Sequence, residues 1–478
     1  MRHAFLFLSL LSTPCLAGAQ TPTLAPEVRA FVKVDAPIVA LRHVRVIDGT
    51  GSAPRDDQTL LMVEGRIRAL GDAATTRIPE DAQVLDLPGH TALPGLVGMH
   101  DHLYYPAPGK EGPRLYPQHA FSFPRLYLAG GVTTIRTTGS VEPYTDLEIK
   151  KAIDAGRMAG PRMHVTGPYL EGKGAFTPQM HELSGPEDAR STVEYWADRG
   201  VTSFKAYMNI TRAELAAVVE AAHARGLKVT GHLCSIGFRE AAGLGIDDLE
   251  HGLVVDAEFV PGKKPDECPP REEQIRSLLP LEVTGPEIRE TIRALVGSNV
   301  AVTSTLPVFE TLVPNRPPLR DRVLEVMTPE ARLSYLERRA RIAQAADSPW
   351  PRLLEKEMKF ERAFAAAGGR LLAGLDPTGY GGVVAGFGSQ RAVELLVEAG
   401  FTPVEAIRIA TANGAEFLGE GHLVGTLAPD KQADVVVVKG DPAADIAAIE
   451  NVVLVFKDGI GYDPDKLIES VRGSVGLR

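Results

Sequence analysis

Apolar and polar positions along the middle of the chain predict strands and helices in alternation. Short apolar runs typical of strands buried on both faces occur at residues 93–100, 131–138, 162–168, 201–208, 228–233, 247–251, 300–306 and 370–376. Apolar residues with helical spacing occur at 146–158, 187–199, 212–225, 235–243, 286–297, 353–367, 389–399 and 403–418. Eight strands alternating with eight helices predict an α/β fold, a (β/α)₈ barrel.

The two ends of the chain have a different pattern, with short β runs separated by turns. These runs extend from Ile38 to Leu87, and they recur at 433–439 and 452–456. We therefore expect a small β-sandwich domain formed by both chain ends. The predicted divisions are a signal peptide at 1–19, sandwich residues at 20–91, the barrel at 92–420 and further sandwich residues at 421–478.

Two connections in the predicted barrel are unusually long. Residues 253–285 are rich in proline and charge, and residues 315–352 are charged with a helical pattern. Long loops on a barrel usually carry function or cover a site. Both inserts are therefore candidates for a roof over the barrel mouth.

The N-terminus has the features of a secretory signal peptide. Arg2 and His3 precede a short apolar run, and Ala17-Gly18-Ala19 resembles a cleavage site. We expect an exported protein, periplasmic or extracellular, with no membrane insertion once the signal is removed. Cys234 and Cys268 then remain, and two cysteines in an exported chain permit one disulfide without requiring it.

Composition narrows the classes of partner. The net charge is −10 and the hydrophobic content is 44%, which is ordinary for a globular protein. Mild acidity gives no reason to expect a nucleic-acid partner. A small-molecule substrate is the expected partner, and the sequence leaves open whether the chain forms a homo-oligomer.

The first predicted barrel strand ends in His100-Asp101-His102. Side chains at i and i+2 in a strand point to the same face, so the two imidazoles project together and make half a zinc site. Such a pair alone is weak evidence, because histidines are more often structural. Its significance depends on finding further ligands at the ends of other strands.

Further candidate ligands stand where other predicted strands end. They are Lys205 in strand four, His232 after strand five, His251 after strand six and Asp376 after strand eight. The C-terminal ends of barrel strands form the active-site face. Each residue alone is more often structural, but packing does not readily explain all of them together. Lys205 is the exception, because an ammonium has no lone pair with which to bind a metal.

Several longer motifs resemble those of one family. LPGLVGMHDH, GLDPTG, FTPVEAIRIATANGAEFLG and GTLAPDKQADVVVVKGDP resemble motifs of the amidohydrolase superfamily of metal-dependent hydrolases. The most similar subgroup is the imidazolonepropionase-like and Xaa-Pro dipeptidase-like one, and the resemblance covers residues 40–465. It implies a distorted (β/α)₈ TIM barrel with the small β-sandwich.

The resemblance also implies a metal centre. Carbon dioxide would carboxylate Lys205, and the resulting carbamate would bridge two divalent cations. Zinc is expected, and Mn²⁺ or Co²⁺ would suit the same donors. One cation would be held by His100, His102 and Asp376, and the other by His232 and His251.

The implied reaction is hydrolysis of an amide bond by a hydroxide bridging the metals, with Asp376 as the catalytic proton carrier. The substrate would be a dipeptide, an N-acyl amino acid or a cyclic amide. A lactone, ester or organophosphate hydrolase using the same metals is the alternative. A catalytically inactive scaffold is a third reading, but it predicts missing ligands, and all six positions are filled.

Three residues are candidates for substrate binding: Arg136, Tyr169 and Tyr207. Arg136 ends strand two and could grip a substrate carboxylate, although a structural ion pair is the alternative. Tyr207 shares the face of Lys205, and Tyr169 follows strand three. Two departures from many relatives, Thr137 after Arg136 and Leu375 before Asp376, leave the substrate open.

Overall fold

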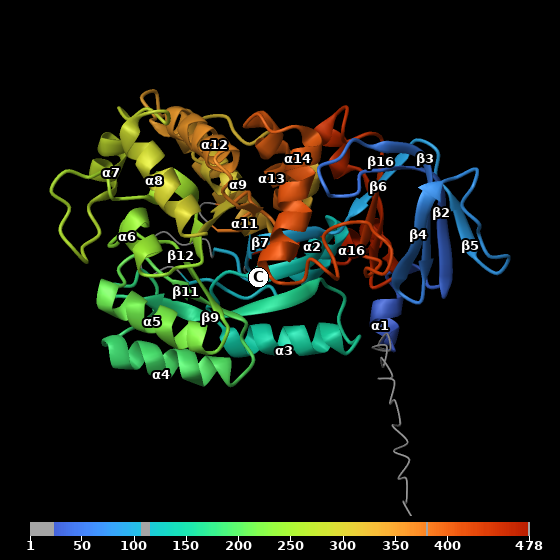
Figure 1. Ribbon diagram of the computed structural model, residues 1–478, viewed down its shortest axis with the longest axis horizontal. Helices are drawn as coiled ribbons and strands as arrows, with labels where there is room; N and C mark the ends of the chain where they lie inside the picture. Colours follow the sequence, from blue (N-terminus) through green and yellow to red (C-terminus); the bar gives the residue numbers. More distant parts are fainter. Residues whose placement is uncertain (1–22, 107–114, 379–380, 477–478) are drawn as a thin grey trace, which may run out of the picture.

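The structure is a computed structural model that describes residues 23–106, 115–378 and 381–476. Within these residues the chain forms two nine-stranded sheets. One sheet forms the barrel, and the other lies to its side (Figure 1). The expected signal peptide, residues 1–19, lies outside the described residues. Throughout the described part, every helix is too short or too polar to cross a membrane.

Eight parallel strands form the barrel wall, and a short strand, β10 (His181–Glu182), adds to β9. The eight are β7 (Leu96–Asp101), β8 (Val132–Thr137), β9 (Arg162–Glu171), β11 (Ser203–Ala206), β12 (Lys228–Gly231), β13 (Asp248–Glu250), β14 (Ala301–Ser304) and β15 (Leu371–Ala373). The amides of Leu375 and Asp376 donate to the His100 carbonyl at 3.3 and 3.0 Å. These bonds join the end of β15 to β7 and confirm the predicted barrel.

Helices alternate with these strands around the barrel (Figure 1). They are α2 (Ser122–Ala129), α3 (Pro143–Asp154), α4 (Pro186–Ala197), α5 (Arg212–Ala224), α6 (Phe238–Gly243), α8 (Pro286–Gly297), α9 (Leu306–Glu310), α12 (Trp350–Ala366) and α13 (Phe387–Glu398). Thr211 and Glu214 form a capping box at the start of α5. The expected helix at 403–418 is divided into α14 (Pro403–Arg408), a π-helical turn (Ile409–Asn413) and α15 (Gly414–Phe417).

The second sheet combines both ends of the chain, as expected. Its strands are β1 (Val32–Val34), β2 (Ile38–Val46), β3 (Arg55–Val63), β4 (Arg66–Asp72), β5 (Gln83–Asp86), β6 (His90–Pro94), β16 (Val435–Lys439), β17 (Val452–Lys457) and β18 (Ile460–Tyr462). Strand β16 pairs with β6, which joins the C-terminal strands to the N-terminal ones. A separate apolar core supports this sheet. Helices α1 (Pro26–Arg29) and α16 (Pro464–Glu469) lie nearby in sequence.

The expected first barrel strand at 93–100 is wrong in one respect, because two strands share it. β6 belongs to the mixed sheet and β7 to the barrel, and Gly95 separates them. A Cβ atom on Gly95 would lie 2.0 Å from the Thr133 hydroxyl oxygen. The chain can therefore cross between the sheets only where a residue has no side chain.

Both long inserts contain helices. The first holds a 3₁₀ turn (Gly252–Val255) and α7 (Arg271–Leu278), and the second holds α10 (Asp321–Val326) and α11 (Pro329–Ala343). A disulfide joins Cys234, just after β12, to Cys268 in the first insert. The first insert is thereby tied to the carboxyl end of a barrel strand.

Candidate metal centre

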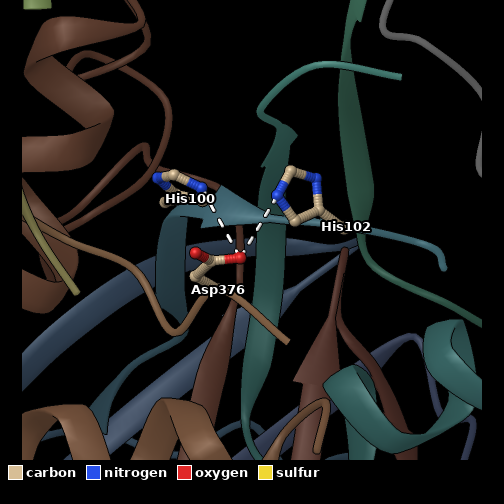
Figure 2. A group of neighbouring side chains, drawn as sticks. All are labelled: His100, His102 and Asp376. Carbon is tan, nitrogen blue, oxygen red and sulfur yellow. Dashed lines mark ion pairs between the residues drawn. The ribbon is translucent and has the colours of Figure 1, made fainter. Parts of the chain in front are cut away.

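The carboxyl ends of the barrel strands bring the expected ligands together. Figure 2 shows His100 of β7 and His102, which directly follows this strand, directed toward Asp376, which follows β15. The Asp376 Oδ1 atom lies 3.8 Å from His100 Nε2 and 3.5 Å from His102 Nε2. Its Oδ2 atom lies 3.9 Å from His251 Nε2. One buried carboxylate therefore faces three imidazoles.

His232 and His251 extend this group along the barrel mouth. Their ring centroids are 4.4 Å apart, and the His251 ring is 4.7 Å from that of His100. His251 and Asp376 both have left-handed backbone conformations, with φ of 67° and 50°. Such values are rare for residues other than glycine and cluster at functional sites. Here they occur where the chain leaves β13 and β15.

The donor set fits divalent cations. The potential ligand atoms of His100, His102 and Asp376 lie within 4.8 Å of one another and are buried, and those of His100, Glu250 and His251 form a second such group. The buried Nδ1 atom of His100, which lies 3.4 Å from Glu250 Oε2 in the second group, has no hydrogen-bond partner among the described residues. Neutral imidazole and carboxylate are the ligands that zinc and related ions prefer.

Protonation favours metal binding as well. Burial lowers the pKa of His251 to about 3, although Asp376 opposes this, so the imidazole is neutral. Burial alone would raise the pKa of Asp376. The hydrogen bond to His102 and the charges of His251 and His102 outweigh burial and hold this pKa at about 2. Asp376 is therefore a carboxylate, and its lone pairs are available.

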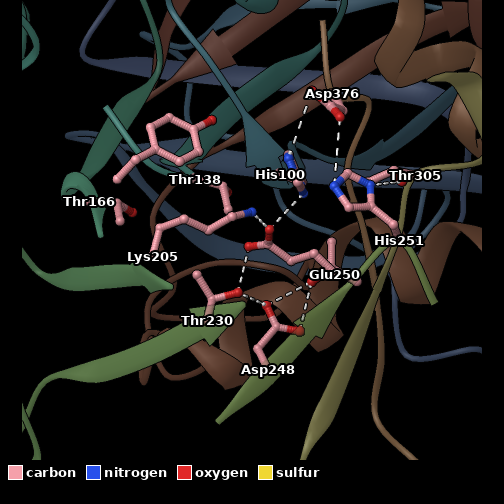
Figure 3. Close-up of polar contacts among 12 residues, drawn as sticks. His100, Thr138, Thr166, Lys205, Thr230, Asp248, Glu250, His251, Thr305 and Asp376 are labelled. Carbon is pink, nitrogen blue, oxygen red and sulfur yellow. Dashed lines mark hydrogen bonds and ion pairs between the residues drawn. The ribbon is translucent and has the colours of Figure 1, made fainter. Parts of the chain in front are cut away.

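Lys205 is buried beside these groups, on β11. Its ammonium contacts the Glu250 carboxylate, as Figure 3 shows. Thr230 donates a hydrogen bond to the other Glu250 oxygen at 2.5 Å. Glu250 is not among the ligands expected from the sequence. The alternation of Asp248 and Glu250 along strand 247–251 could have indicated it, because both then face the barrel interior.

Arg136 does not fit the role of substrate ligand that its position at the end of strand two suggested. Its side chain is 1% exposed and does not line the mouth cavity. Its Nη2 atom donates to Asp248 at 2.6 Å, and its Nε atom donates to the Met99 carbonyl at 2.9 Å. The guanidinium is thus part of a buried ion pair inside the barrel, the alternative that the sequence left open.

A cavity of about 370 Å³ opens above the ligands. Tyr169 and Tyr207 line it, as do Tyr104 and residues of both inserts, including Arg271 and Trp350. The Tyr169 hydroxyl contacts that of Tyr104 and lies 3.4 Å from His102 Nε2. Tyr169 and Tyr207 therefore lie where a substrate would contact them, and their roles in substrate binding stay predictions.

Similar proteins agree with this architecture. The chain matches the model of the amidohydrolase family over residues 91–460. A solved protein from Bifidobacterium longum, described as a candidate prolidase, is 26% identical with a TM-score of 0.63, and the match covers 92% of this chain and 99% of that one. A solved Xaa-Pro dipeptidase with bound methionine is 20% identical with a TM-score of 0.66, covering 89% and 100%.

Curated relatives match over shorter segments. An enamidase from Eubacterium barkeri is 25% identical over 217 residues, which are 43% of this chain and 52% of the enamidase. A dihydroorotase from Syntrophus aciditrophicus (strain SB) is 35% identical over 108 residues, 23% of this chain and 24% of the dihydroorotase. The chain thus spans about a quarter to a half of these relatives. The family match over most of the chain nevertheless confirms the resemblance found in the sequence: the protein belongs to the amidohydrolase family.

Proposed function

We propose that the protein is a binuclear metal-dependent hydrolase that cleaves the C–N amide bond of a small molecule. The observation that carries this proposal is the convergence of strand-end donors around Asp376, with buried Lys205 beside them. Zinc is the proposed metal, and Lys205 the proposed site of carboxylation by carbon dioxide. His100, His102 and Asp376 would hold one ion, and His232 and His251 the other.

When bound, divalent cations would lower the pKa of a water molecule and polarise the scissile carbonyl. The protein's own task is then to move a proton. Asp376 faces the imidazoles and can accept the proton of the attacking water. It can then deliver that proton to the departing nitrogen. An amine leaves poorly unless it is protonated, so this transfer completes the cleavage.

An amide substrate is favoured over a lactone, ester or organophosphate. The same centre could attack any of them, but prolidase, Xaa-Pro dipeptidase and enamidase are the names carried by similar proteins. A catalytically inactive scaffold is disfavoured because the predicted ligands are present and brought together.

The test combines metal analysis with a substrate screen. The metal-loaded protein should contain about two divalent ions per chain. It should hydrolyse dipeptides, N-acyl amino acids or cyclic amides faster than lactones or organophosphates.

His232→Ala should lose metal and activity. His223→Ala, a matched control in which the histidine lies on α5 paired with Asp247 at 2.9 Å, should lose neither. Absence of metal after expression with zinc or manganese would reject the binuclear centre.

We also propose that the protein is exported. The signal-peptide pattern at 1–19 supports this, as does the Cys234–Cys268 disulfide, because disulfides persist in oxidising compartments. N-terminal sequencing of the protein from a periplasmic or extracellular fraction should place the first residue just after Ala19. A mature protein that begins at Met1 would contradict export.

A further inference from the structure

The wall of the mouth cavity contributed by the first insert carries an arginine, Arg271, at the start of α7. Its Nη1 atom donates to the Val254 carbonyl at 2.9 Å and to the Gln274 side-chain oxygen at 3.1 Å. Its guanidinium carbon lies 5.5 Å from the centre of the Trp350 ring. These contacts fix the side chain in place, so its position in the cavity is defined before any ligand arrives.

Further contacts tie Arg271 to the metal centre. Gln274, which accepts from Arg271, is buried and donates to the Pro269 carbonyl at 2.7 Å. Pro269 follows Cys268, and the disulfide connects Cys268 to Cys234. Cys234 stands two residues after His232 in the chain. The arginine is therefore held at a set position relative to a predicted metal ligand.

Charge in the cavity is unevenly distributed. Among the described residues that line it, Lys205 and Arg271 are the ones with lysine or arginine side chains. Lys205 is buried against Glu250. Burial is the main cause of the lowered pKa of His232 and of His251, and the charge of Arg271 contributes to both. Arg271 is thus a cationic side chain in the described part of the cavity wall.

Apolar residues form part of the cavity wall that also holds Arg271. Phe309 and Trp350 stack with ring centroids 6.1 Å apart, and Val308 and Leu312 line the same cavity. An ion pair in such a place is less screened than one at the surface. A planar guanidinium also offers several donors in an arrangement that matches a carboxylate.

We infer that Arg271 binds a free carboxylate on the amine side of the substrate. This inference rests on the proposed amide hydrolysis and narrows it. The favoured substrates are dipeptides and N-acyl amino acids, in which the departing amine carries the carboxylate. Neutral cyclic amides are disfavoured. Arg271 takes the role that the sequence had suggested for Arg136, whose guanidinium is engaged inside the barrel.

The experiment compares kcat/KM for leucyl-phenylalanine and for its C-terminal amide, using the full metal-loaded chain. Wild type, Arg271→Met and Arg271→Lys are tested. Arg276→Met is the matched control, because Arg276 lies on the same helix and is exposed. A charge-assisted hydrogen bond contributes about 1.5–3 kcal/mol, so wild type should prefer the acid by about 10- to 150-fold.

Arg271→Met should lose most of this preference through a higher KM for the acid. Its kcat/KM should fall more for the acid than for the amide, and its metal content should remain near wild type. Arg271→Lys should recover part of the preference, and Arg276→Met should keep all of it. A preference that survives in Arg271→Met would overturn the inference.

Binding of the amine product gives a second test that needs no variant and no turnover. Calorimetry on the metal-loaded wild type should show tighter binding of phenylalanine than of phenylalaninamide. Equal binding, or equal hydrolysis of acid and amide, would overturn the role of Arg271 and leave amide hydrolysis standing. If metal-loaded wild type hydrolyses neither form and no other amide, the proposed function fails, and this inference fails with it.

Discussion

Replacing Arg136 by methionine should destabilise the barrel rather than change its substrate preference. The Arg136 guanidinium and the Asp248 carboxylate are both buried, and the atoms Nη2 and Oδ2 are 2.6 Å apart. The methionine side chain is unbranched like the aliphatic part of arginine, but it carries no charge. The variant therefore leaves the Asp248 carboxylate buried without its main counter-charge. The Met99 carbonyl loses the Arg136 donor, while the Thr138 hydroxyl still donates to it at 2.9 Å.

The size of the effect follows from these contacts. Breaking a buried ion pair by removing one partner costs about 3–5 kcal/mol. The Thr303 hydroxyl still donates to Asp248 in the variant, at 2.9 Å, whereas the single proton of the Thr230 hydroxyl goes to Glu250. The bond from Thr303 offsets part of the loss. We expect the free energy of unfolding to fall by about 3–5 kcal/mol.

Urea denaturation, followed by tryptophan fluorescence, measures this change. The double variant Arg136→Met/Asp248→Asn should be more stable than Arg136→Met alone, because it removes the uncompensated charge and keeps an oxygen that can accept from Thr303. The acid-to-amide ratio of kcat/KM should equal that of wild type. A loss of stability below about 1 kcal/mol, together with a lost preference for the acid, would refute the structural role.

Three further predictions concern buried ionisable groups. Lys205→Ala should lose metal and turnover, and short carboxylic acids should restore part of both; mass spectrometry showing an unmodified lysine in active, metal-loaded protein would contradict carboxylation. Asp376→Asn should keep its fold but lose about 10²- to 10⁴-fold in kcat, and a near-normal kcat would exclude the proton role. Burial raises the pKa of Asp146 to about 7, despite hydrogen bonds from Ser140 and Gln118. This carboxyl ionises at lower pH in the unfolded chain, so the stability of wild type should fall as the pH rises from about 4 to 7 and level off above. In thermal unfolding, Asp146→Asn should lack this loss. A stability difference between wild type and Asp146→Asn that does not change with pH would contradict the prediction.

The alternation of strands and helices allowed the barrel to be predicted, because each buried strand is a short apolar run followed by polar residues. The same feature located His100, His102 and Asp376, which stand where apolar runs end. Helix α2 was missed, because it follows the first strand without a clear polar face; most of its residues are buried. The break at Gly95 was missed as well, since the apolar pattern continues through it.

Long-range partners decided what the sequence could not. Alternation placed Arg136 on a barrel strand, but whether it faced a ligand or another strand depended on Asp248, 112 positions away. Arg271 lies in an insert without strand or helix periodicity at its start, so its distance from the barrel mouth was not predictable. Only the folded chain, with its disulfide and the Gln274 contacts, brings it to the cavity.

The charges inside the barrel give a physical reason why carboxylation and metal binding should depend on each other. Arg136 with Asp248, and Lys205 with Glu250, form two buried pairs that balance in charge. A carbamate on Lys205 would replace a positive charge with a negative one beside Glu250 and close to Asp376. Uncompensated negative charge is strongly disfavoured at buried positions. Two divalent cations supply the missing positive charge. We therefore expect the carbamate to persist only while metal is bound, and to be lost as carbon dioxide when a chelator removes the metal.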